Sequence, residues 1–187
     1  MHRAAPPRGP ANQRFGWHRD NWIGGTPQAN AWCDDWCEFF AERRLAPQIA
    51  LAQRNGFADL ARAAAHVRNA LPQLLRGHAP APSLVHGDLW SGNAATLAGG
   101  EPVVFDPAVH VADREVDLAM TELFGGFDDA FYAAYDDAYP RPAGHALRRD
   151  VYNLYHLLNH VNLFGAAYAS KTRRTLDRTL AGLGPTA

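Results

Sequence analysis

A short stretch in the middle of the chain interrupts a sequence pattern that is otherwise helical. Residues 83–87 predict a strand that runs into a loop, and residues 94–97 and 102–105 predict two further strands. Ala98-Gly99-Gly100, between the last two, is typical of a hairpin turn. We therefore expect a small β-hairpin within a mainly helical α+β domain.

Helical spacing of apolar residues occurs on both sides of this β segment. Before it, the pattern predicts a helix from Ala31, with Asn30 as its N-cap and Pro47 beyond its end. A second helix is predicted over 57–76, with Gly77 as its stop. After the β segment, helices are predicted over 115–124, 128–139, 143–168 and 171–180.

The remaining segments carry little periodicity. Residues 1–14 predict an irregular lead-in, and residues 15–30 predict an ordered loop packed by its large aromatic side chains. Residues 183–187 are expected to form a tail. A chain of 187 residues has room for one domain that buries about 70% of the surface of the unfolded chain, so residues 15–182 are expected to form a single domain.

The composition limits the partners that the chain can have. Its net charge of −1 gives no overall field that would attract nucleic acid or anionic lipid, so neither is expected. Two cysteines, Cys33 and Cys37, are too few for the disulfide framework of a small secreted protein. Residues 1–14 lack the apolar region of a signal peptide, and no apolar run is long enough to span a membrane. We expect a cytoplasmic protein.

The chemistry of the chain is concentrated in the loop after the first predicted strand. His86, Asp88 and Asn93 form the pattern H-x-D-x-x-x-x-N, and Asp106 follows at the end of the predicted hairpin. Phosphoryl transfer needs a carboxylate that accepts the proton of the attacking hydroxyl, and hard oxygen ligands that hold Mg²⁺ against the nucleotide phosphates. Because the hairpin returns Asp106 to this loop, Asp88 is the expected base, and Asn93 and Asp106 are the expected metal ligands.

This pattern is specific. The chain's own frequencies of His, Asp and Asn give about 0.03 chance matches to it. His18-Arg19-Asp20 imitates part of the motif, but Gly25 stands where the metal-binding asparagine is needed, so we reject it as the catalytic loop. The competing interpretation of residues 86–93 is a polar loop between strands without a catalytic role.

Several segments together resemble one known family. They are FGWHRDNWIG (15–24), HGDLWSGN (86–93), FDPA (105–108), DREVDLAM (113–120), FGGF (124–127) and LLNHVNLFG (157–165). They resemble the fructosamine kinase (ketosamine 3-kinase) family, from about residue 15 to about residue 180. The resemblance implies the C-terminal lobe of a protein-kinase-like fold, shared with aminoglycoside phosphotransferases. It also implies ATP-dependent phosphorylation of the 3-hydroxyl of sugar-amine adducts, which destabilises the adduct and reverses glycation.

The resemblance assigns catalytic roles to individual residues. Asp88 matches the base, and Asn93 and Asp106 match the ligands of Mg²⁺, which acts with ATP. Asp117 resembles the buried helix carboxylate that supports the catalytic loop, and His86 belongs to the same support.

Substrate binding is expected beside these residues. Trp90, two residues past the base, offers a flat apolar face on which a sugar ring can stack, with a place in the core as the alternative. His18, Asp20 and Asn21 lie in a family-like stretch and are further candidates, with a simple loop between lobes as the alternative. The expected partner is a small ketosamine or a glycated protein.

The sequence also departs from the family's pattern. Kinases of this class hold the nucleotide in an N-terminal lobe with a Gly-rich loop and a strand lysine. No G-x-G-x-x-G motif occurs here, and the single lysine, Lys171, lies far downstream of Asp106. We expect that this lobe is missing through truncation or a misassigned start, or is supplied by a separate chain. The face that it would cover is expected to expose apolar side chains and to favour association.

Two other interpretations of the function stay open. A lobe without its nucleotide half would be a non-catalytic module that binds sugar-amines or a partner protein. Another phosphotransferase of the same fold, acting on aminoglycosides or choline, is the second, although Trp90 and the FGWH stretch disfavour it.

Two histidines one helical turn apart, His156 and His160, also attract attention. No glutamate of an H-E-x-x-H metal site lies between them, so we interpret them as helix-packing residues.

Overall fold

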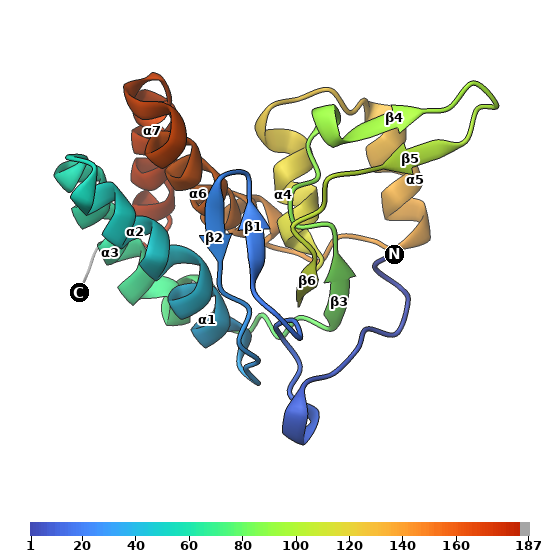
Figure 1. The fold of residues 1–187 in the computed structure, drawn as a ribbon, viewed down its shortest axis with the longest axis horizontal. Helices are drawn as coiled ribbons and strands as arrows, with labels where there is room; N and C mark the ends of the chain where they lie inside the picture. The colour runs from blue at the N-terminus through green and yellow to red at the C-terminus, as the bar shows by residue number, and fades with distance from the viewer. Residues whose placement is uncertain (184–187) are drawn as a thin grey trace.

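The computed structural model describes residues 1–183 and divides into a helical layer and a smaller part with the strands beside it (Figure 1). Helices α2, α3, α6 and α7 pack on one another in the helical layer. They comprise Ala46–Arg54, Ala58–Leu74, His145–Phe164 and Ala169–Ala181. Helix α6 also packs against α4 (Glu115–Leu123), and this contact joins the two parts. A further helix, α5, spans Asp129–Ala138.

These helices confirm the predicted order of elements. The predicted helix over 57–76 is α3, and the one over 143–168 is α6 followed by a 3-10 turn over Gly165–Tyr168. Of the predicted tail, residues 184–187 lie outside the described residues. Among residues 1–183, no helix combines the length and the apolar character that crossing a membrane requires.

The predicted start of the first helix is wrong. Helix α1 begins at Trp36 and not at Ala31, because the side chain of Asp35 caps it by accepting a hydrogen bond from Glu38 N at 2.7 Å. Asn30 is buried and bonded elsewhere. Helix α1 (Trp36–Phe39) continues through a π-helical segment over 40–45 directly into α2, so Pro47 lies within one continuous helical run and not beyond its end.

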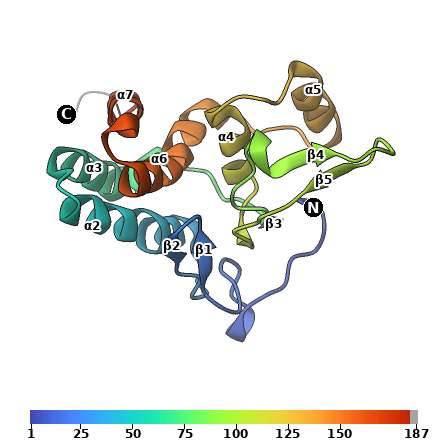
Figure 2. The same cartoon turned by 45° about the horizontal axis from the view of Figure 1, so that its top comes forward.

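The strands form three two-stranded antiparallel sheets among the described residues. The pairs are β1 (Asn21–Ile23) with β2 (Thr26–Gln28), β3 (Pro82–Val85) with β6 (His110–Asp113), and β4 (Ala94–Thr96) with β5 (Pro102–Val104). The β4–β5 pair confirms the predicted hairpin, which projects away from the helical layer in both views (Figure 2).

Two of these elements differ from the sequence-based expectation. Residues 21–28, expected within a loop, form the β1–β2 hairpin, and Gly24 supplies the left-handed backbone of its turn with a φ of 55°. Strand β6 has no predicted counterpart. All four of its residues are buried, so it lacks the alternation of polar and apolar residues that marks a half-exposed strand.

The hydrophobic core lies mainly between α3, α6 and the helical run from α1 to α2. Its fully buried large side chains include Phe15, Phe39, Leu71, Leu154 and Leu158. Residues 1–14 are irregular apart from a 3-10 turn over Pro10–Asn12. Val85 of β3 and Val116 of α4 belong to this core, which therefore anchors the strand that precedes the motif loop and the helix that carries Asp117.

Candidate active site

The loop after β3 makes a sharp turn at Gly87. This residue has a φ of 82°, and a Cβ atom placed on it would lie 2.2 Å from the carbonyl oxygen of Ala108. Both the left-handed backbone and the close approach require glycine. The turn sends the chain from β3 toward Asp88.

The side chain of Asp117 stabilises this turn. Its carboxylate is fully buried and accepts hydrogen bonds from His86 N and Gly87 N, both at 2.8 Å. His2 Nε2 lies 3.0 Å from Asp117 Oδ2, and His2 Nδ1 lies 2.7 Å from the hydroxyl of Tyr135. Asp117 therefore has the geometry expected of a group that supports the catalytic loop, and His2 of the N-terminal segment contacts the same carboxylate.

Asp88 and Asn93 face each other across the loop. Asn93 Nδ2 donates to the backbone oxygen of Asp88 at 2.9 Å and to Asp88 Oδ2 at 3.2 Å, and its Oδ1 stays outside these contacts. Burial raises the pKa of Asp88 to about 6; the charges of Asp106 and Asp117 act in the same direction, against His86 and the Asn93 hydrogen bond. A carboxylate with a pKa in this range is suited to general-base chemistry near neutral pH.

His86 ties the loop to the segment that carries Asp106. Its Nε2 lies 2.9 Å from the carbonyl oxygen of Phe105, and its Nδ1 lies 3.3 Å from Asp88 N. Asp106 follows directly, with a left-handed φ of 56° that is uncommon outside glycine. Residues held in such conformations cluster at functional sites.

A cavity of about 460 Å³ opens in front of these residues and brings Asp88, Asn93 and Asp106 together. The cavity is also lined by aromatic side chains from the motif loop, the end of α4, α6 and the turn after α6. This aromatic wall consists of Trp90, Phe124, His160, Phe164 and Tyr168. Trp90 is 39% exposed and meets Phe124 edge to face at 6.4 Å, so it has a free surface toward solvent.

The interpretation of His156 and His160 as helix-packing residues is incomplete. Both line the same cavity, and His156 Nδ1 lies 3.9 Å from Asp88 Oδ1. The position of the two histidines could not be predicted from the sequence. Their spacing shows that they share a face of α6, but not that this face is directed toward the motif loop. Two histidines that share one face of a helix are the sequence signal that could have indicated residues lining the cavity.

The other substrate candidates lie outside this cavity. Asp20 Oδ1 accepts a hydrogen bond from Asn30 N at 2.8 Å, and Asn21 Nδ2 donates to the carbonyl oxygen of Val109 at 2.8 Å. His18 is exposed and its ring packs on Trp17. None of the three lines the cavity, and a role for them in substrate binding stays a prediction. Asp20 and Asn21 hold the β1–β2 region together.

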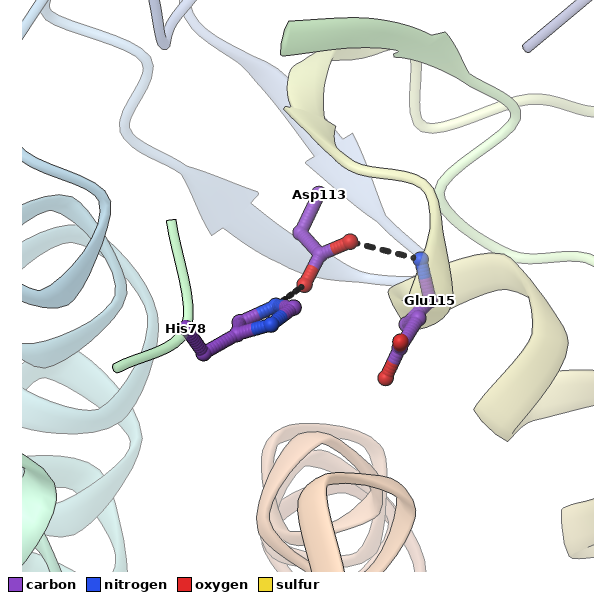
Figure 3. A group of neighbouring side chains, drawn as sticks. All are labelled: His78, Asp113 and Glu115. Carbon is purple, nitrogen blue, oxygen red and sulfur yellow. Dashed lines mark hydrogen bonds and ion pairs between the residues drawn. The ribbon is translucent and has the colours of Figure 1, made fainter. Parts of the chain in front are cut away.

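A second group of metal-ligating side chains, His78, Asp113 and Glu115, gathers at the end of the β3–β6 pair away from the motif loop (Figure 3). Its oxygen atoms are already engaged. Asp113 accepts from Glu115 N at 3.0 Å, from Tyr152 at 2.7 Å and pairs with His78 at 2.6 Å. Arg148 donates to both carboxylate oxygens of Glu115, at 2.8 and 2.9 Å. This group is therefore a structural ion-pair network.

Asn93 and Asp106 suit a cation better. Among the described residues Asp106 makes no ion pair and its side chain forms no hydrogen bond, and the Oδ1 of Asn93 is also outside the hydrogen bonds of the loop. One carboxylate and one amide oxygen facing an open cavity are the hard donors that Mg²⁺ takes when water and phosphate complete its shell. The residues present fit this ion.

Comparisons with known proteins agree with the motif. A sequence model of the fructosamine kinase family matches residues 1–182. A "probable ketoamine kinase" of Synechocystis is 53% identical over 169 residues, covering 89% of this chain and 56% of that protein. A chloroplastic protein-ribulosamine 3-kinase of Arabidopsis thaliana is 43% identical over 180 residues, covering 95% of this chain and 53% of that protein.

A solved structure also resembles this chain. A chain from Thermobifida fusca that carries the name fructosamine-3-kinase superposes with a TM-score of 0.84 at 37% identity, over 90% of this chain and 59% of that one. This confirms the predicted kinase-like fold. The chain spans about half the length of the curated relatives it matches. By sequence and by structure, it belongs to the fructosamine kinase family.

Proposed function

We propose that this chain carries the catalytic centre of an ATP-dependent kinase that phosphorylates ketosamines. The observation that carries the proposal is the placement of Asp88, held by Asn93, beside Asp106 at one cavity. In this role Asp88 accepts the proton of the sugar hydroxyl as it attacks the γ-phosphorus. Its raised pKa, about 6, leaves it ionised at pH 7 and basic enough to take that proton.

Asn93 and Asp106 are the proposed ligands of Mg²⁺. When bound, the ion would neutralise charge that develops on the phosphate oxygens. The part played by the protein is to keep the two oxygen donors next to Asp88. The hydrogen bonds of His86 to Phe105 and Asp88 serve that purpose, because they fix the base and the Asp106 segment to one side chain.

The substrate class follows from the aromatic wall and from the relatives. A sugar ring presents apolar C–H groups that stack on indole, and the exposed face of Trp90 is available for it. The amine of a ketosamine is cationic when protonated, and cations bind well over aromatic rings. Two relatives are named for ketoamines and ribulosamines, which supports a free ketosamine or a glycated protein as substrate.

ATP use and the free thiols of Cys33 and Cys37 favour the cytoplasm as the place of action.

The nucleotide requires more than these residues supply. Residues 1–187 contain no G-x-G-x-x-G motif, and Lys171, the single lysine, lies on α7 with its ammonium over the ring of Phe124. Phosphoryl transfer depends on positioning and charge stabilisation, so a polypeptide of these residues alone is expected to turn over slowly or not at all. If it binds ketosamines without turnover, the non-catalytic binding module is the second candidate.

A kinase assay separates these outcomes. Residues 1–187 are incubated with ATP, Mg²⁺ and a ribulosamine, alongside a chimera that carries ahead of Met1 the part of the Synechocystis relative that this chain does not match. We expect phosphorylated ribulosamine from the chimera and little from residues 1–187 alone. Ribulosamine binding by a well-folded chimera without any phosphorylation would favour the binding module and contradict the kinase.

A further inference from the structure

The imidazole of His156 is a buried polar group whose inner nitrogen has no partner. The residue lies on α6 and is 4% exposed, and its Nδ1 forms no hydrogen bond among the described residues. Burying a polar atom without a partner is unfavourable, so such an atom in a native protein calls for an explanation. The nearest charged acceptor is Asp88 Oδ1, at 3.9 Å.

The imidazole of His156 is uncharged at neutral pH. Burial, together with the charges of His160 and Arg44, lowers the pKa of His156 to about 3, although the charge of Asp117 acts in the opposite direction. A neutral imidazole carries a proton on only one of its two nitrogens. If that nitrogen is Nδ1, His156 offers Asp88 a hydrogen bond without protonating the carboxylate, and the base keeps its negative charge.

The two oxygens of Asp88 have different surroundings. Oδ2 accepts from Asn93 at 3.2 Å, whereas Oδ1 faces His156. A distance of 3.9 Å exceeds that of a hydrogen bond by about 1 Å, and catalytic hydrogen bonds that are long in the free protein often tighten in the reacting complex. With both donors engaged, the carboxylate plane is fixed, and its remaining lone pairs point into the cavity.

We infer that His156 is a positioning residue for Asp88 and donates from Nδ1 to Asp88 Oδ1 in the reacting complex. This inference rests on the proposed function, in which Asp88 is the base. A competing arrangement places one water molecule in the void of about 10 Å³ that His156 shares with Gly87 and Tyr155. In that arrangement Nδ1 needs no proton.

The tautomer of His156 tests the inference without any enzyme assay. Residues 1–187 labelled with ¹⁵N in histidine are studied by NMR, with His156 assigned by its loss in His156→Asn. We expect a neutral ring protonated at Nδ1, and a smaller share of this tautomer in Asp88→Ala. Protonation at Nε2 in the unsubstituted chain, or the same tautomer share in Asp88→Ala, would overturn the inference.

Three variants in the chimera give the functional readout. Asn places an amide donor near the position of Nδ1, Gln places it near Nε2, and Leu keeps bulk without a donor. We expect His156→Asn to keep kcat within about 3-fold, and His156→Gln and His156→Leu to lose about 10- to 100-fold in kcat with nearly unchanged KM for ribulosamine. Equal losses in Asn and Gln at matched melting temperatures, or losses confined to KM, would show a structural or binding role instead.

The outcomes separate this inference from the function on which it rests. If Asp88→Asn leaves turnover of the chimera unchanged, the proposed base is wrong and the role of His156 falls with it. If Asp88→Asn removes turnover and the His156 ring is protonated at Nε2, only the positioning role is wrong.

Discussion

The carboxylate of Asp117 and the backbone of Gly87 meet in a buried hydrogen bond of 2.8 Å, from Gly87 N to Asp117 Oδ1. A second bond runs from His86 N to Asp117 Oδ2 at the same distance. Helix α4 thereby fixes the turn that delivers Asp88 to the cavity. The position of Asp88, the proposed base, is thus set by a group that does not contact the cavity itself.

Replacement of Asp117 tests this support. Asp117→Asn can keep only one of the two backbone bonds, because its Nδ2 would face an N–H donor. We expect a loss of about 1–3 kcal/mol in the free energy of unfolding, measured by urea denaturation. The exposed Asp59→Asn, on the first turn of α3, is the control and should stay near the wild-type value. Equal effects of the two variants would contradict the support role.

The turn at Gly87 permits a matched pair of alanine variants. Gly87 and Gly77 have similar left-handed φ values of 82° and 75°, but only Gly87 would place its Cβ against backbone, since nothing lies within 4 Å of a Cβ at Gly77. Gly77→Ala should cost about 1 kcal/mol from the backbone conformation alone. Gly87→Ala should cost at least about 2 kcal/mol more, in urea denaturation. If Gly87→Ala lowers the free energy of unfolding no more than Gly77→Ala does, the loop can move to accommodate the added Cβ atom.

The ion-pair network around Glu115 predicts that the stability of the fold depends on pH in the acid range. Burial raises the pKa of Glu115, but the hydrogen bonds from His145 and Arg148 outweigh it, and the pKa falls to about 2 from the ordinary 4.5. The folded state therefore binds this proton less readily than the unfolded state. The stabilisation from Glu115 is complete above about pH 4.5 and is lost as the pH falls toward 2.

Substitution of Glu115 should reduce this acid sensitivity. Between pH 4.5 and 2, the free energy of unfolding of the unsubstituted chain should fall more steeply than that of Glu115→Gln, by up to about 1.4 kcal/mol per pH unit. Urea titrations at a series of pH values measure both slopes. Parallel slopes would mean that Glu115 titrates normally in the folded protein.

Mn²⁺ provides a direct probe of the two candidate metal groups. Titration of Mn²⁺ into ¹⁵N-labelled chain should broaden backbone resonances near Asn93 and Asp106 and leave those near His78 and Asp113 sharp. Asp106→Asn should weaken the broadening, whereas His78→Ala should not. Broadening centred on His78 would contradict the view that this group is fully occupied by hydrogen bonds.

The sequence predicts the hairpin that connects the candidate site residues better than it predicts the elements around it. The spacing of Asp88, Asn93 and Asp106 depends on one short hairpin, and local turn chemistry at 98–100 is enough to specify it. The start of α1 is less predictable, because Asn30 and Asp35 are both good caps. Tertiary contacts decide between them by burying Asn30 against Asp20 and Asn21.

Local sequence patterns do not predict which residues from distant parts of the chain lie next to the site. His156 lies 68 residues from Asp88 along the chain, and nothing in the periodicity of α6 shows which element it faces. The same holds for β6, whose partner β3 lies across the hairpin and whose burial on both faces removes its alternation. His2 reaches Asp117 from a segment without any periodic signal.

The central claim is that Asp88 is the base of a ketosamine kinase, and one pair of rates tests it most directly. The turnover of ribulosamine by the chimera is compared with that of its Asp88→Asn variant, at saturating ATP and Mg²⁺. Loss of the base should lower kcat by about 10²- to 10⁴-fold, with KM for ATP nearly unchanged, because Asn keeps the shape but cannot accept the proton. A variant that retains turnover within a few-fold of the unsubstituted chimera would contradict the account.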